Sequence, residues 1–475
     1  MTAGQITIEW GNLERMFAAM NKVGDQAFEI DVYFGDKVCD PSGFAYDSCA
    51  LKPIGDMLPM VAGYFDDMRR LFNERWQGVG DAIHNTARQV DIRDGGINHV
   101  FTNYRGSNVP SHLLPAPIDV DIEVFEIADL GAALGEPEAG SEKLNHNNAF
   151  DAAAATWETA RDTINWGIDL INRAGVGVPR LSELSLRDYI VYPLSANYAQ
   201  IQSNASACQM VDGAMQQWGG NFTQLSGKVV LGLEGQAGLA LVAQLNLYGA
   251  VMRLVGKGVG EGSLVFEQIA TMSERIAVEV EDVLVILGKK LAKLSSKIAS
   301  RFVPGLGWVL LAIDIARTKG AVIQDILDDI EQCRQILDDC FALVEEIQDW
   351  AQTQADRLAK FQELLEVVKQ LPVVGDMVPL DQLSTDLSDV EGALSDVADF
   401  GSPEGGETDA LDGELEGLGD NDYEDSSSSG TTEDPYAPND DGVLMAPGPP
   451  LQIDPETGEL VQPSYGSGSG SGAIA

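Results

Sequence analysis

Apolar residues recur at spacings of three and four over most of the first 370 positions, which is the period of an amphipathic α-helix. The pattern predicts helices over 8–32, 51–101, 147–174, 193–218, 239–255, 264–301 and 326–368. Only 118–127 largely alternates between apolar and acidic residues, as a short strand would. One strand does not change the class. We therefore predict an all-α protein built from helical hairpins and a long antiparallel bundle.

The first predicted domain is an N-terminal hairpin over residues 1–108. A short helix and a longer one are joined by a turn at 35–50, and Trp76 falls inside the second arm or at a bend in it. Prolines mark a linker over 109–139, which contains the short strand. A second helical domain is expected over 140–370, and a tail over 371–475.

The second domain is organised around Trp218-Gly219-Gly220. An apolar stripe runs along the preceding helix as far as Trp218. Glycine readily takes the positive φ that ends a helix, so we predict a corner at 218–220 between two antiparallel helices. A second glycine-rich segment at 256–262 follows a helical pattern and lacks P-loop spacing. It is interpreted as a hinge and not as a phosphate-binding loop.

The strongest periodicity is a seam in which spacings of four and three alternate for six heptads, as in a coiled coil. Its members are Ile326, Ile330, Cys333, Leu337, Cys340, Val344, Ile347, Ala351, Gln354, Leu358, Phe361, Leu365 and Val368. Acidic residues flank this seam, and lysines end the predicted helix before it. Their charges predict an antiparallel pair. The alternative is that the lysine-rich face lies on anionic lipid.

Charge excludes one class of partner. The chain has 74 acidic and 30 basic residues, a formal net charge of −44, so we expect no nucleic-acid binding, which needs a basic surface. From residue 370 to the end there are 24 acidic residues and no lysine or arginine. Gly, Ser, Pro, Asp and Glu dominate from 401 on, and this composition predicts a disordered acidic tail.

Motifs for catalysis or metal binding are not found. The four histidines form no His-Glu-x-x-His motif, and Cys-x-x-Cys and Gly-x-Ser-x-Gly are absent from the sequence. We therefore expect no metal, no cofactor and no enzymatic activity. Cys39 and Cys49 bracket a loop, and they form either a small disulfide or two free thiols.

The N-terminal residues lack the apolar core of a signal peptide, and the longest nearly apolar stretch, 302–313, is too short to span a bilayer. Export would therefore need a route that is independent of a signal peptide. The chain would be cytoplasmic before it is exported.

Several residues of the second domain resemble those of the Trp-x-Gly (WXG-type) helical hairpin proteins of actinobacterial type VII (ESX) secretion. These residues are Pro193, Leu194, Asn197, Tyr198, Trp218 and Gly220. The 1–108 hairpin similarly resembles the small ESX-secretion-associated domains. The resemblance implies secreted or cell-surface helical hairpins that have no catalysis of their own. It also implies a helical partner or self-association, and contact with the secretion machinery.

The family's export signal is Tyr-x-x-x-Asp/Glu after a helix, in which the Tyr stands four positions before the acidic residue. Tyr436 and Asp440 match this spacing in the tail, although Pro438 between them departs from a helical context.

Three hypotheses follow. The leading one is a non-enzymatic type VII secretion substrate, or a secretion-associated structural or partner-binding protein. The alternative is a membrane-active helical effector, in which glycines at 232–238 and 256–262 let the apolar helix 239–255 swing out. A cytosolic coiled-coil adaptor is the third.

Overall fold

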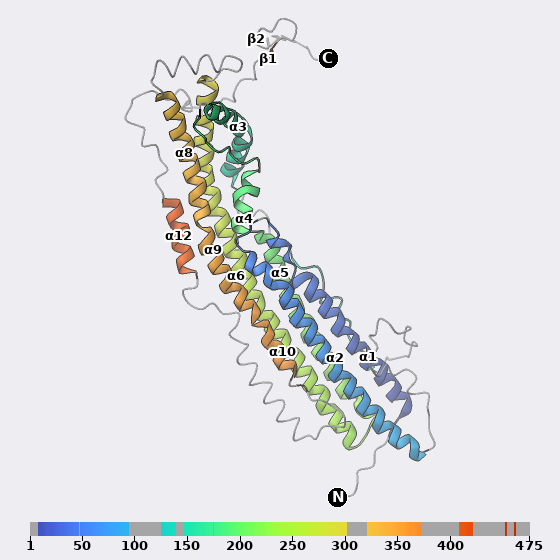
Figure 1. Cartoon of the computed structure of the whole chain (residues 1–475). Coiled ribbons are helices and arrows are strands. Elements are labelled where there is room, and N and C mark those ends of the chain that lie inside the picture. The colour runs from blue at the N-terminus through green and yellow to red at the C-terminus, as the bar shows by residue number, and fades with distance from the viewer. Residues whose placement is uncertain are drawn as a thin grey trace, which may run out of the picture. The chain divides into compact units, whose positions relative to one another are not determined.

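The computed structural model describes residues 8–46, 48–94, 125–138, 147–173, 175–301, 321–369, 371, 408–420, 452–453 and 460–461. Contacts divide the chain into two compact units, residues 1–422 and 423–475. Figure 1 shows the helices of the first unit, which confirm the all-α prediction. They are α1 Trp10–Tyr33, α2 Lys52–Asp94, α3 Asn148–Arg173, α4 Tyr192–Ser195, α5 Tyr198–Lys228, α6 Gln236–Arg301, α8 Ala321–Ala342, α9 Val344–Ala359, α10 Phe361–Lys369 and α12 Asp409–Asp420.

Short irregular turns connect some of these helices. Two are π-helical, η1 Phe34–Val38 and η6 Arg187–Val191, and two are 3-10 helices, η2 Pro41–Phe44 and η7 Val229–Leu231. In the second unit, the described residues form two antiparallel strands, β1 Gln452–Ile453 and β2 Leu460–Val461, with Gln452 opposite Val461.

Helix α6 is the longest described element of the first unit. It has 66 residues, which is about 100 Å at 1.5 Å per residue. Helix α5 packs along its N-terminal half, and α3 and α8 pack along its C-terminal half. By length and composition, α6 is also the one helix among the described residues that could cross a membrane, over 237–300. Of its most apolar window, 61% is buried inside the protein, as expected for a core helix.

The predicted corner at 218–220 is wrong. Helix α5 continues through Trp218, Gly219 and Gly220 to Lys228. The reason is a close approach of two helices: a Cβ at Gly219 would lie 2.7 Å from the carbonyl oxygen of Gly249 on α6. Glycine is used here for the space it leaves and not for a positive φ.

The predicted hinge at 256–262 is wrong for the same reason, because these residues lie inside α6. A Cβ at Gly256 would lie 2.6 Å from Cβ of Met215, and one at Gly262 would overlap the ring of Phe361. The glycines therefore let α5 and α10 pack closely on α6.

The hairpin between α5 and α6 turns at 229–235 instead. Helix η7 leads into Gly232, and Gly235 has a φ of +86°, a conformation that glycine adopts readily. Leu233 forms an isolated antiparallel bridge with Ile8, and the Asn12 side chain donates a hydrogen bond of 2.8 Å to the carbonyl of Leu231. The start of α1 thus fastens this turn.

The N-terminal hairpin forms as predicted, since α1 and α2 are joined by residues 34–51 and Trp76 lies inside α2. It is not an isolated domain, because α1 packs on α5 and α2 packs on α9 and α10 within one unit. Part of the expected linker, 125–138, also lies against the helices: Lys22 and Gln26 of α1 donate to the carbonyls of Ile127 and Ala128. Residues 118–124 of the expected strand lie outside the described residues, and 125–127 form no strand.

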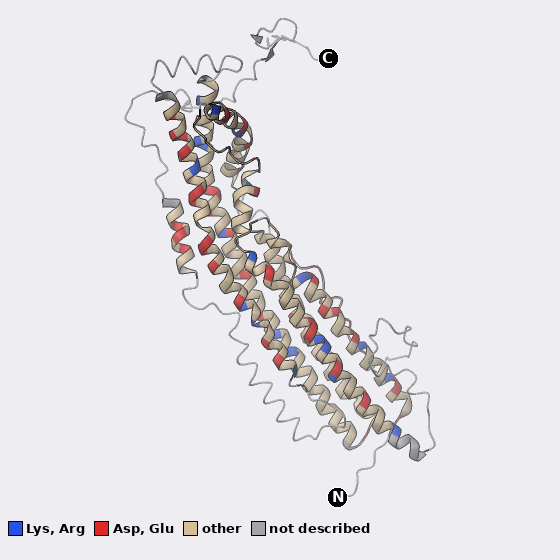
Figure 2. Cartoon of the chain, viewed as in Figure 1, with Lys and Arg blue, Asp and Glu red and all other residues tan. Residues whose placement is uncertain are grey.

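The predicted seam is divided among α8, α9 and α10, with breaks at Leu343 and Lys360. All its members are buried except Val344 and Leu365, which are half-buried. The predicted pairing with the end of α6 is also confirmed. Lys297 binds Asp325 at 2.8 Å and Asp329 at 2.5 Å. Figure 2 shows acidic and basic residues along both of these helices.

One part of the tail differs from the expectation of disorder. Residues Asp409–Asp420 form helix α12, which packs on α6 and α9. Apart from 408–420, β1 and β2, the tail from 372 on lies outside the described residues.

Candidate interaction surfaces

Trp218 joins the two helical hairpins. Its indole N–H donates a hydrogen bond of 2.9 Å to the carbonyl of Val23 on α1. From α2, Trp76 likewise donates to the carbonyl of Met20 at 3.0 Å. Phe72 packs edge-on against Trp218, with ring centroids 4.7 Å apart. The hairpin α5–α6 is therefore held on the hairpin α1–α2 by a buried aromatic cluster with directional hydrogen bonds.

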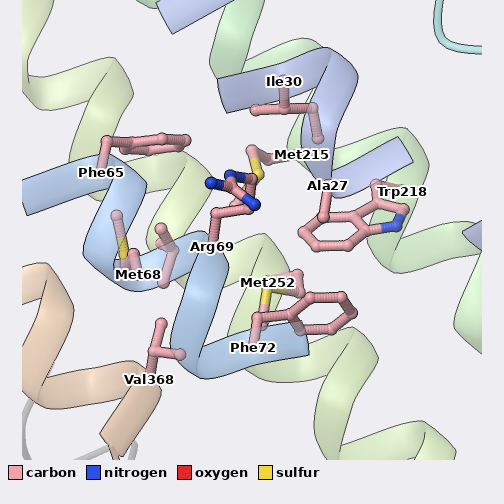
Figure 3. A pocket seen from close by; sticks show the side chains of 11 residues that line it. Ala27, Ile30, Phe65, Met68, Arg69, Phe72, Met215, Trp218, Met252 and Val368 are labelled. Atoms are coloured by element: carbon pink, nitrogen blue, oxygen red, sulfur yellow. The ribbon is translucent and has the colours of Figure 1, made fainter. Parts of the chain in front are cut away.

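A small cavity lies beside this cluster, where α1, α2, α5, α6 and α10 meet (Figure 3). It measures about 20 Å³ and has an almost wholly apolar lining. The lining is Ala27, Ile30, Phe65, Met68, Arg69, Phe72, Met215, Trp218, Met252, Val255 and Val368. Arg69 is already bound to Asp31 at 2.5 Å and to Asp66. Because the volume suits about one water molecule, the cavity is no site for an organic ligand.

The predicted segment Pro193–Tyr198 spans the end of α4 and the start of α5. Asn197 is the N-cap, since its side-chain oxygen accepts from the backbone N–H of Gln200 at 3.2 Å. Leu194 is buried, and Tyr198 is half-buried at the first helical position. The carbonyl of Pro193 accepts a hydrogen bond of 2.7 Å from the backbone N–H of Ala50.

That last contact brings two predicted sites together, because Ala50 follows the Cys39–Cys49 loop. Tyr46 of this loop stacks on Tyr192, with centroids 4.8 Å apart. The disulfide alternative is wrong: Cys39 and Cys49 are both free and buried. Burial raises the pKa of the Cys49 thiol to about 11, so it is protonated at neutral pH. Trp218 and Gly220 lie about six turns farther along α5, and the predicted motif residues do not form a single surface.

Tyr436 and Asp440 lie outside the described residues.

The α5–α6 turn carries exposed apolar side chains. Val230, Leu231 and Leu239 are 51%, 41% and 57% exposed, respectively. They surround the positive-φ Gly235 at the end of the hairpin. We call Val230, Leu231 and Leu239 the apolar tip. Val230 and Leu231 lie in η7 and Leu239 lies in the first turn of α6, so the three exposed side chains are close in sequence at this end of the hairpin, where a partner could contact them.

A charged cluster that the sequence analysis missed lies between α3, η6 and α6. Arg187 binds Asp151 at 3.1 Å and Glu281 at 3.4 Å, and its guanidinium lies 4.8 Å from the centre of the Phe150 ring. Burial raises the pKa of Glu281 to about 7, aided by Asp151 and Asp282 and opposed by Arg187. No sequence spacing links these residues, so only the packing of three elements reveals them.

Within the described ranges, no group of three or more His, Cys, Asp or Glu side chains is arranged to hold a metal ion. Comparison with known proteins finds no matching family model, curated protein or solved structure. Function is therefore inferred from the geometry of the interaction surfaces and from the motif resemblance.

Proposed function

We propose that this chain is a non-enzymatic, partner-binding protein of type VII secretion, either a substrate or a secretion-associated component. The observation that supports this most is the packing of two antiparallel hairpins, α1–α2 and α5–α6, joined through Trp218. Helical hairpins are the architecture that the motif resemblance implies. The proposed partner is a helical protein or a second copy of the chain.

The proposal assigns separate roles to the motif residues. Trp218 is buried, so its role is to hold the hairpins together and not to contact the machinery directly. The export signal is assigned to Tyr436 and Asp440, which come after α12, the last helix that the structure describes. The chain is then cytoplasmic before export, and secreted or at the cell surface afterwards.

The test is fractionation of the native host with and without a working type VII secretion ATPase. We expect the chain in the medium or cell wall of the wild-type host only. Combined Tyr436→Ala and Asp440→Ala substitutions should retain it in the cytosol, whereas Tyr465→Ala, a change elsewhere in the tail, should not. A chain that stays cytosolic in both hosts would refute type VII export and favour the coiled-coil adaptor.

A membrane-active effector is the second candidate, and the apolar tip is the observation that favours it. The tip stands next to the N-terminal end of α6, the helix with the composition of a membrane span. Flotation with anionic vesicles tests this function. Membrane binding should be lost on combined Leu231→Asp and Leu239→Asp substitution and kept on Leu184→Asp, which changes another exposed leucine. Wild-type protein that does not float rules the candidate out.

A further inference from the structure

Helix α12 sits on the rest of the first unit through one narrow face. Leu411, Leu415 and Leu418 are 2%, 0% and 4% exposed, and their spacing of four and three places them on one stripe. Helix α12 contacts α6 and α9, and Figure 1 shows it lying alongside the bundle. On α6, Arg275 binds Asp412 in a close ion pair and reaches Glu416 at 3.7 Å. The surface of α6 and α9 that α12 covers, which we call the groove, thus holds an acidic helix through its apolar stripe and Arg275.

The helix that fills this groove is a poor helix former. It has 12 residues, and helices of this length are marginal on their own. Gly413 and Gly417 have no neighbouring atom within 4 Å of the position of a Cβ, so the packing does not require glycine at either place. Each glycine lowers helix formation about four- to five-fold relative to alanine. The ion pairs of Arg275 are partly exposed, which limits what they add to binding.

Helix α12 stays in the groove because the helix and the groove belong to the same chain. The 37 residues at 372–408 separate α12 from Leu371 at the end of the bundle. A tether of such length gives an effective concentration of about a millimolar, which keeps even a weak helix in place. A partner helix without the two glycines would bind the same groove more tightly and displace α12.

We propose that α12 is a displaceable cover, and that the groove between α6 and α9 is a docking site for an acidic amphipathic helix of a partner protein. Such a helix carries apolar residues at positions i, i+4 and i+7 and an acidic residue next to the first of them, where it meets Arg275. This is the helix-in-groove mode of recognition. The proposal gives the partner-binding function a surface, and it is tested without reference to export.

The probe is a fluorescent peptide of residues 408–420 with Gly413→Ala and Gly417→Ala. Its binding to the full chain is measured by fluorescence anisotropy. A variant with Leu411→Asp and Leu415→Asp detaches the cover and should bind the peptide at least ten-fold more tightly than the wild type does. Ala410→Asp, an exposed change on the same helix, should behave as the wild type. Adding Arg275→Glu to the detached variant should weaken binding at least ten-fold.

Hydrogen exchange on the wild-type chain provides an independent measurement. The amides of α12 should exchange much faster than those of α6, since the cover opens without unfolding of the bundle. Equal protection of α12 and α6 would overturn the proposal, as would peptide binding that is insensitive to Arg275→Glu. A wild-type dimer that dissociates on Leu411→Asp and Leu415→Asp would also overturn it, because α12 would then be exchanged between copies.

Discussion

Gly219 and Gly220 are neighbours in one helix, yet they should respond in opposite ways to alanine. At Gly219, a Cβ would lie 2.7 Å from the Gly249 carbonyl oxygen and 2.5 Å from Cγ of Arg253. The first of these atoms belongs to the backbone of α6, so the two helices would have to separate. At Gly220, no neighbouring heavy atom lies within 4 Å.

The magnitudes follow from these contacts. Alanine in place of glycine inside a helix is worth about 0.8–1 kcal/mol, and this is the stabilisation expected for Gly220→Ala. Gly219→Ala has the same gain, but overpacking a tight interface destabilises by about 1–3 kcal/mol. Backbone atoms yield little, which places Gly219→Ala at the upper end. Its net effect is then a destabilisation of about 1–2 kcal/mol, and the two variants differ by about 2–3 kcal/mol.

Urea denaturation of both variants, followed by circular dichroism, measures this difference as a shift in the transition midpoint. The wild type should fall between them, with Gly220→Ala above it. If Gly220→Ala were strongly destabilising, glycine at 220 would be needed for a positive φ, and α5 would end at the Trp-Gly-Gly corner that the sequence indicates. If both variants were stabilised, α5 and α6 would not approach each other closely at Gly219.

Three further predictions concern charge and thiols. Because the pKa of Glu281 is about 7 in the folded chain, above its ordinary 4.5, the stability that this group contributes is fully present below pH 4.5 and is lost as the pH rises through 7. Glu281→Gln should therefore raise the Tm at pH 8 by more than at pH 5. An equal shift in Tm at the two pH values would contradict the raised pKa of Glu281. Lys297→Glu places an anion beside Asp325 and Asp329 and should destabilise the fold by about 1–2 kcal/mol. The midpoint of urea unfolding measures this loss. Lys289→Glu, at an exposed position of the same helix, should leave the midpoint almost unchanged. All five cysteines should resist a thiol reagent in the native chain and react on unfolding, and a mass 2 Da low under non-reducing conditions would reveal a disulfide instead.

Periodicity predicts most of the helices because nearly every buried helix face in this chain has a repeated apolar stripe. The seam at 326–368 was predicted in detail, and so was the pairing of Lys297 with an acidic helix, since complementary charges lie at the two sides of a turn. The breaks at Leu343 and Lys360 could not be predicted, because neither residue is a helix breaker.

Glycine was the main source of error, since one residue type serves two purposes. In isolation, Gly219-Gly220 and the glycines at 256–262 weaken a helix and indicate turns. Contact with Gly249, Met215 and Phe361 makes glycine necessary inside a continuous helix, and this contact depends on which helix packs opposite. Helix α12 was missed for a related reason. Its stripe of leucines is visible in the sequence, but its two glycines and its acidic surroundings resemble a solvated tail.

The position of the true turn limits how the chain can act on a membrane. For α6 to swing out over 239–255, Leu241, Leu245, Tyr248, Val251, Met252 and Val255 would all have to leave the core, where each is at most 2% exposed. Exposing these six side chains costs about 9–18 kcal/mol at about 1.5–3 kcal/mol each, which is comparable to the whole stability of a typical domain. The glycines at 256–262 supply no hinge, since they are helical and packed, and those at 232–235 lie in the turn, where bending would not spare these six side chains from exposure. If the folded chain binds a membrane, we therefore expect the apolar tip, among the described residues, to make the contact, and Leu231→Asp with Leu239→Asp should abolish binding without unfolding the bundle.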